Sequence, residues 1–119
     1  MNIEAFRNYC LYKKGVTESF PFDESTLVFK VMDKMFALTG LNKIPFSVNL
    51  KCDPDRAITL RESYSEIIPG YHMNKKHWNT VEFSDSLPDT LLKELIDHSY
   101  ELVVASLPKK TQALLATLD

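Results

Sequence analysis

Phe46–Lys51, FSVNLK, alternates apolar and polar side chains without a break. Successive side chains of a β-strand point to opposite faces of a sheet, so Phe46, Val48 and Leu50 share one face and the polar residues share the other. A strand with one buried and one wet face is typical of an antiparallel sheet that is covered on one side only. The stretch therefore predicts such a sheet, with a largely open second face.

Two segments with apolar side chains at helical spacing supply the cover for the buried face. Residues 2–13 carry one stripe, with Asn2 as the capping residue and Gly15 beyond its end. Residues 88–106 carry a longer stripe that Pro108 ends. We expect the helices to pack on one face of the sheet, because each has an apolar side to bury.

The remaining elements follow from the same periodicities and from turn residues. They are a strand pair over residues 27–31 and 35–38 with a turn at Asp33-Lys34, a helix from Asp53-Pro54 to about Ser65, a strand over residues 78–83 and a last helix after Pro108. The strands are grouped rather than alternating with helices, which predicts an α+β fold in a single domain over residues 1–119.

The composition is that of an ordinary globular protein, with 45% hydrophobic residues, 25% charged residues and a net charge of −2. No apolar run approaches the roughly 18–20 residues of a membrane helix, and the N-terminus lacks the features of a signal peptide. We therefore expect a cytoplasmic protein with no membrane partner. Cys10 and Cys52 do not form a C-x-x-C pair, which favours packed, reduced thiols over a zinc site.

Charge is distributed unevenly along the chain. Residues 43–78 hold six basic and four acidic side chains, whereas residues 79–119 hold three basic and seven acidic ones. Such asymmetry can orient a protein on a polyanion. The small excess of positive charge in the central third predicts a low affinity for such a partner at physiological salt.

The segment Pro69–Val81, PGYHMNKKHWNTV, is the part of the chain richest in chemical groups. It holds two of the three histidines, two adjacent lysines and the single tryptophan. Binding groups often lie on loops that a rigid scaffold holds in place. The candidate contacts with a nucleic acid or another ligand are Lys51, His72, Asn74, Lys75, Lys76, His77 and Trp78.

The histidines and the asparagine of this segment have structural explanations. His72 and His77 are five residues apart, which does not suit a helical metal pair, and the segment offers no acidic or cysteine side chain as a third ligand. No metal is therefore expected. Asn74 and one of the histidines are expected to fix the backbone of the loop by hydrogen bonds.

The lysines and the tryptophan leave alternatives open. Lys75 is either a phosphate contact or a solvated charge, and a solvated charge is the better explanation for Lys76. Trp78 is either a platform for a base or a sugar on the open face, beside Lys51, or a core residue folded under the loop. The sequence contains no G-x-S-x-G motif and no glycine-rich phosphate loop, so we expect neither an enzyme nor a cofactor.

The same loop resembles the His-x-Asn-Lys-x-His-Trp signature of the MmcQ/YjbR family of small bacterial proteins, through His72, Asn74, Lys75, His77 and Trp78. Further segments similar to that family are 15–22, 27–31, 34–38 and 86–89. The resemblance implies a fold like that of the frataxin/CyaY group and a role in DNA binding. Frataxins carry many acidic residues along the first helix, where this chain has only Glu4, so iron binding is not carried over.

The combined expectation is a non-enzymatic DNA-binding module of a regulatory kind, with weak and salt-dependent affinity. The alternative is a protein-interaction or small-ligand-binding module that uses the open sheet face and the loop 69–78.

Overall fold

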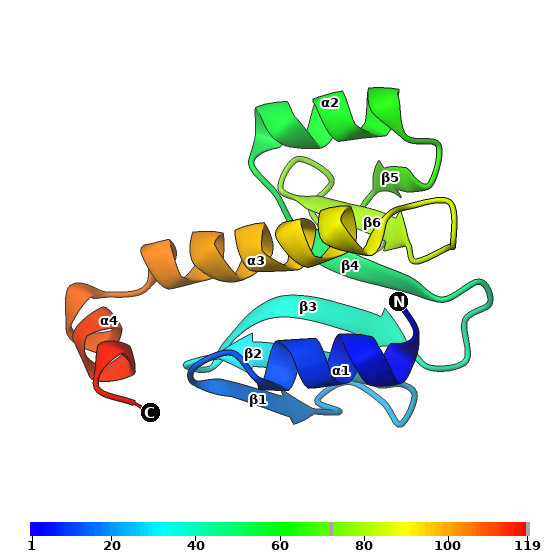
Figure 1. The fold of residues 1–119 in the computed structure, drawn as a ribbon. Helices are drawn as coiled ribbons and strands as arrows, with labels where there is room; N and C mark the ends of the chain where they lie inside the picture. The colour runs from blue at the N-terminus through cyan, green and yellow to red at the C-terminus, as the bar shows by residue number, and fades with distance from the viewer. Residues whose placement is uncertain (72, 119) are drawn as a thin grey trace.

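The computed structural model describes residues 1–71 and 73–118, which form an α+β fold (Figure 1). Within this part of the chain, six strands form one sheet in the order β1-β2-β3-β4-β6-β5, and every neighbouring pair is antiparallel. The elements are α1 (Ile3–Leu11), β1 (Val16–Ser19), β2 (Thr26–Val31), β3 (Lys34–Gly40), β4 (Ser47–Lys51), α2 (Pro54–Ser63), β5 (Ile67–Pro69), β6 (Trp78–Glu82), α3 (Asp89–Ser106) and α4 (Lys109–Ala116).

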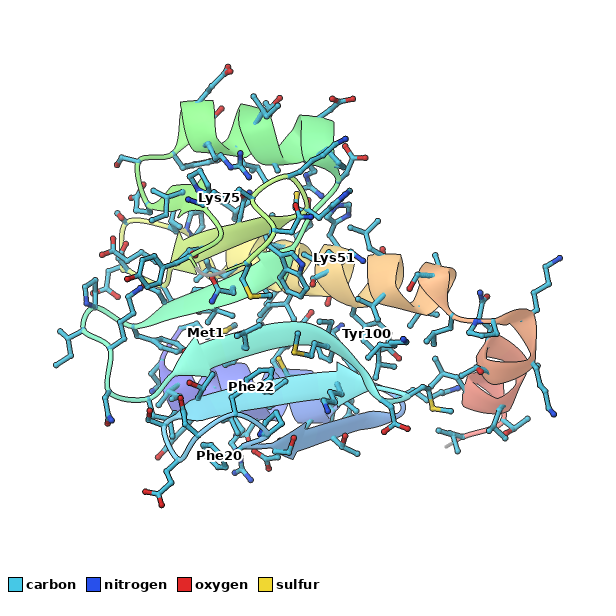
Figure 2. All side chains as sticks on the ribbon, turned by 180° about the vertical axis from the view of Figure 1, so that it is seen from behind. Met1, Phe20, Phe22, Lys51, Lys75 and Tyr100 are labelled. Carbon is cyan, nitrogen blue, oxygen red and sulfur yellow. The ribbon has the colours of Figure 1, made fainter. Side chains whose placement is uncertain are left out.

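Helices α1 and α3 cover one face of the sheet. They cross in front of the strands in Figure 1, while α2 lies beyond β5 and β6 and α4 follows the end of α3. Figure 2 looks from behind and shows the strands in front of α1 and α3. The opposite face of the central strands therefore carries no helix from the described residues.

The core lies between the covered face and the helices. Phe6 of α1 is fully buried and meets Phe29 of β2 edge-on, with the ring centroids 5.3 Å apart. Ser99 of α3 is also fully buried; its hydroxyl donates to the Phe36 carbonyl at 2.5 Å and accepts from the Lys51 N–H at 2.9 Å. This one side chain fixes α3 against both β3 and β4.

Several local predictions are confirmed. Val48 and Leu50 are buried while the polar residues of β4 are half-buried, as the alternation in FSVNLK requires. Asn2 Oδ1 accepts from the N–H of Ala5 at 2.8 Å and begins α1. Asp53 caps α2 in the same way. Short side chains at these caps satisfy N–H groups that the first helical turn leaves without partners.

The expected turn between the first two long strands is wrong by one residue. The connection between β2 and β3 is Met32-Asp33 rather than Asp33-Lys34, because Val31 pairs directly with Lys34. Both turn residues have positive φ, 49° and 69°. A two-residue hairpin turn of type I′ has positive φ at both positions, which matches the twist of the strands, and this conformation is unusual for a methionine.

The two edge strands were not expected from the sequence. Strand β1 reads VTES and has no second apolar residue to establish an alternation. Strand β5 is only three residues long and includes Pro69, which has no N–H for a sheet ladder. Both form because they pair with a longer neighbour, β2 and β6 respectively.

The two cysteines behave as packed thiols, as expected. Cys10 and Cys52 are free and buried, and burial raises the pKa of their thiols to about 12 and about 11. Neither is therefore a thiolate at neutral pH. A separate property of the described chain is that none of its helices has both the length and the apolar character needed to cross a membrane.

Candidate nucleic-acid interface

The open face of the sheet collects the polar side chains that the sequence placed there. In the pairing of β4 with β6, Asn49 lies opposite Thr80 and Lys51 lies opposite Trp78. Thr80 Oγ1 donates to Asn49 Oδ1 at 2.5 Å. The predicted sharing of one face by these two strands is confirmed.

The open face has a basic end. Lys51 and Trp78 form the last cross-strand pair of β4 and β6. The pairing of β2 with β3 shifts by one residue between Phe29 and Lys30. Because of this bulge, the residue of β3 that follows Leu38 on the open face is Met35, which pairs with Lys30 of β2. A row therefore runs across four strands from Trp78 through Lys51 and Met35 to Lys30. Figure 2 looks onto this side and labels Lys51 and Lys75 in its upper part.

The other end of the same face is acidic. Glu82 lies opposite Ser47, and the N–H of Glu82 donates to the carbonyl of Glu66 at 2.9 Å. Ser86 donates a hydrogen bond to the carboxylate of Glu66, which lowers the pKa of this group and keeps it ionised at neutral pH. Lys43 lines the same surface as these two carboxylates, so this end carries a net negative charge while the other end is basic.

The loop beside the basic end is held by its own backbone. The N–H of Gly70 donates to the carbonyl of Trp78 at 2.8 Å, and the N–H of Trp78 donates to the carbonyl of Asn74 at 3.0 Å. Asn74 Oδ1 also accepts from the N–H of Lys76 at 2.9 Å, so the expected role of Asn74 in fixing the loop is confirmed. At its start, the N–H of Tyr71 donates to Thr80 Oγ1 at 2.9 Å.

Arg61 of α2 is the residue of this site that the sequence did not reveal. Its Nε donates to Asn79 Oδ1 at 2.7 Å, and its Nη2 donates to the carbonyls of Lys75 and, at 3.4 Å, of Trp78. The guanidinium therefore joins α2, β6 and the loop. Its partners are two backbone carbonyls and a buried amide, and backbone carbonyls leave no signal in a sequence.

Gly70 is the other residue that this geometry requires. A Cβ at this position would lie 2.8 Å from the Cβ of Trp78 and 3.0 Å from its carbonyl oxygen. Distances this short leave no room for any larger side chain. The glycine therefore lets the start of the loop approach the first residue of β6 closely enough for the hydrogen bond between them.

The predicted contact residues fall into two groups. Lys75 and Lys76 are exposed, and neither they nor Lys30 and Lys51 form an ion pair with any described residue. His77 is half-buried, and the hydrogen bonds of this residue that the structure defines use its backbone rather than its ring. The predictions for His72 lie outside the described residues.

Trp78 is not the core residue that one interpretation made it. It is half-buried on the open face, outside the cluster of core residues and outside the side chains that pack against that cluster. The reason is the alternation of β6, because Val81 and Asn79 point to the covered side and leave Trp78 and Thr80 on the other.

Other clusters of ionisable groups have structural roles. Asp97 of α3 accepts from the Tyr9 hydroxyl at 2.8 Å and pairs with Lys13, which joins α3 to α1 and its C-terminal end. Burial and the hydrogen bond to Asp97 raise the pKa of Tyr9 to about 12. In the described part of the chain, no group of three or more His, Cys, Asp or Glu side chains is placed to hold a metal ion.

Comparison with known proteins gives full-length relatives. The YjbR family profile matches residues 11–102. The uncharacterized protein YjbR of Escherichia coli K12 is 36% identical over 118 residues, covering 99% of this chain and 100% of its own; YbdF of E. coli O157:H7 is 43% identical over 94 residues, covering 78% and 76%. A crystal structure of a DUF419-domain protein from Deinococcus radiodurans superposes with a TM-score of 0.91 at 40% identity, covering 97% of this chain and 88% of that one.

Proposed function

The chain belongs to the YjbR family, and we propose that it is a non-enzymatic DNA-binding module whose contact surface is the basic end of the open sheet face. YjbR and YbdF of E. coli are described as uncharacterized, so the proposal rests on this chain's own surface and on the resemblance noted in its sequence. The observation that carries it is the gathering of four lysines at one end of this face, two on the strands and two on the adjoining loop: Lys30, Lys51, Lys75 and Lys76.

Lysines without acidic partners favour a phosphate backbone as the ligand. Among the described lysines only Lys13 forms an ion pair, so what sets these four lysines apart is their position at one end of the open face and on the loop beside it. The acidic end of the same face, at Glu66 and Glu82, would repel a polyanion and keep it at the basic end. Such polarity supports an oriented contact rather than diffuse attraction.

Four phosphate contacts imply weak binding to DNA. Each phosphate contact lowers the logarithm of the binding constant by about 0.9 per logarithmic unit of salt for duplex DNA and by about 0.7 for a single strand, so four contacts give a slope of about 3.6 or about 2.8. The affinity should therefore fall steeply between about 50 mM and about 200 mM salt. A regulatory or accessory role in which the protein binds DNA and releases it readily suits this range.

The frataxin/CyaY-like arrangement belongs to the same proposal. It is supported by an antiparallel sheet with α1 and α3 together on one face (Figure 1). The iron chemistry of frataxins is not part of it, since the described residues of α1 include only Glu4 as an acidic side chain.

The test is a titration of a labelled DNA hairpin with an unpaired tail, which offers both duplex and single-stranded DNA. Lys51→Ala and Lys75→Ala should each weaken binding and lower the salt slope, by about 0.9 if the contact is with the duplex and by about 0.7 if it is with the single strand. The matched control is Lys110→Ala, an exposed lysine on α4 whose replacement should leave both quantities unchanged. Undetectable binding at low salt, or equal effects of all three variants, would reject the surface as a DNA site.

A protein-interaction surface is the second candidate, because apolar side chains of β5 and of the connection between β3 and β4 remain in water. Ile44 is 93% exposed and Ile68 of β5 is 49% exposed. A second copy of the chain could cover them. Light scattering tests this. A molecular mass that rises with protein concentration in the unmodified chain, but stays at the monomer value in Ile44→Lys, would favour this candidate if the protein also binds no DNA.

A further inference from the structure

We infer that the DNA taken by this surface is single-stranded and that one unpaired base stacks on Trp78, an inference that rests on the proposed DNA-binding function. A duplex keeps its bases stacked on one another, so a protein aromatic ring can reach a base face only where the strand is unpaired. Three features of the described surface support this choice.

The first feature is the place of the ring. Trp78 is half-buried on the open face, outside the core, with Lys51 as its direct cross-strand partner. Neighbouring strands are about 4.8 Å apart, so the Lys51 stem lies about 5 Å from the tryptophan and Lys30, two strands further, roughly 10 Å beyond that. An aromatic ring flanked by cations can bind a base and its neighbouring phosphates together.

The second feature is the shape of the face. Six strands spaced about 4.8 Å apart span roughly 24 Å, which is about twice the 12 Å width of the major groove of a DNA duplex. No helix of the described chain stands on this face to enter a groove (Figure 2). A single strand has no groove to be entered and can lie across the strands of the sheet.

The third feature is the rigidity of the loop beside the ring. Arg61 holds the carbonyls of Lys75 and Trp78, and Asn74 closes the turn, so Lys75 stands on a fixed backbone next to the platform. A contact surface that is already ordered loses little conformational entropy on binding. The lysine can therefore meet a phosphate next to the stacked base without rearrangement of the loop.

The chain provides its own probe, because Trp78 is its only tryptophan. Titration with oligo(dT) should quench the intrinsic fluorescence as the base stacks. The matched ligand is a strand of equal length with abasic sites, which has the same phosphates but no bases. It should bind at least about fivefold more weakly and leave the fluorescence unchanged, since one stacked base is worth a factor of about five or more.

Variants separate stacking from a structural role of the ring. The backbone groups of Trp78 that hold the loop remain in any substitution. Trp78→Phe should keep part of the affinity for labelled oligo(dT), and Trp78→Ala should lose about fivefold or more. Affinity for the abasic strand should be the same in both variants and in the unmodified protein, which also shows that the phosphate contacts remain intact.

The outcomes distinguish this inference from the function on which it rests. Binding to duplex DNA that equals or exceeds binding to oligo(dT), without quenching of Trp78, would overturn the single-strand inference and leave the DNA-binding function standing. Quenching by the abasic strand equal to that by oligo(dT) would overturn the stacking. Binding to no DNA of any form at low salt would reject the function as well.

Discussion

At the scale of single residues, the shape of the candidate surface depends on residues that support the loop without contacting a ligand. Arg61 and Gly70 set the path of the loop, whereas Lys75 stands on it with an exposed side chain. Substitutions should therefore separate residues that build the site from residues that use it. Folding stability reports on the first kind, and DNA affinity on the second.

Replacing Gly70 with alanine should destabilise the fold by about 1–3 kcal/mol, because the added Cβ would lie 2.8 Å from another Cβ and 3.0 Å from a backbone oxygen. Gly40→Ala is the control. Its Cβ would meet only Lys43, at 3.7 Å, and its stability should change by no more than about 0.5 kcal/mol. Urea unfolding measures both. Equal effects would show that the close approach at Gly70 is relieved without cost.

Lys75→Ala and Arg61→Ala should have different consequences. The lysine is exposed and forms no ion pair with the described residues, so its loss should leave the melting temperature nearly unchanged while DNA affinity falls. Loss of the arginine leaves the buried Asn79 Oδ1 without its donor, which costs about 1–3 kcal/mol. Thermal unfolding beside DNA titration measures both. If Lys75→Ala unfolds the protein and Arg61→Ala does not, the two roles are reversed.

Trp78→Ala should be milder than the truncation of a core aromatic residue. Removing a buried Phe or Trp typically costs about 3–5 kcal/mol, and Trp78 lies outside the core cluster. Its substitution should therefore cost less than about 3 kcal/mol in urea unfolding. Phe29→Ala in the core is the comparison and should reach that range. A larger loss at Trp78 than at Phe29 would mean that the ring supports the fold more than its position on the sheet indicates.

At the scale of elements, side chains of α3 hold three neighbouring elements in place. Ser99 fixes β3 and β4, and the ring of His98 accepts from the N–H of Asp53, the capping residue of α2, at 3.2 Å. Only a neutral imidazole can accept that bond. Burial, and then the nearby Arg56 cation, lower the pKa of His98, while Glu94, Asp53 and Glu101 act in the opposite direction.

Stability should therefore fall in acid because of His98. Its pKa is lowered in the folded protein, so below its ordinary value of about 6.5 the unfolded chain takes up the proton first. The stabilising contribution is complete above that value and is lost as the pH falls towards the pKa of the folded state. Urea unfolding between about pH 5.5 and pH 7.5 should show a smaller acid loss in His98→Gln than in the unmodified protein. An identical pH profile would contradict this.

The elements that could be predicted from the sequence are those with a clear period. The alternation of β4 and the stripes of α1 and α3 gave both their positions and their covered face, and the alternation of β6 placed Trp78 beside Lys51. Strands β1 and β5 could not be predicted, because their neighbours rather than their own residues make them strands. Arg61 could not be predicted either, because it binds groups 14 to 18 residues away across the intervening loop.

At the scale of the whole molecule, the proposed function rests on two differences. The two faces of the sheet differ in helix cover, and the two ends of the open face differ in charge. One face is closed by α1 and α3 and holds the core. The other is free of described helices and is more basic at the end that carries Trp78 and Lys51 than at the end where Lys43 lies with Glu66 and Glu82. The net charge of −2 hides this polarity because the acidic groups lie elsewhere, including the far end of the same face. An anionic partner should therefore bind in one place and one orientation.

The most direct measurement is a map of amide NMR shifts of the isotope-labelled protein during titration with oligo(dT). The expected shifts cluster at Lys30, Lys51, Lys75 and the backbone and indole N–H of Trp78, and they weaken as salt rises from about 50 mM to about 200 mM. The acidic end around Glu82 and the helices α1 and α3 should remain unchanged. Shifts confined to α1 and α3, or no shifts at low salt, would contradict a DNA site on the basic end of the open face.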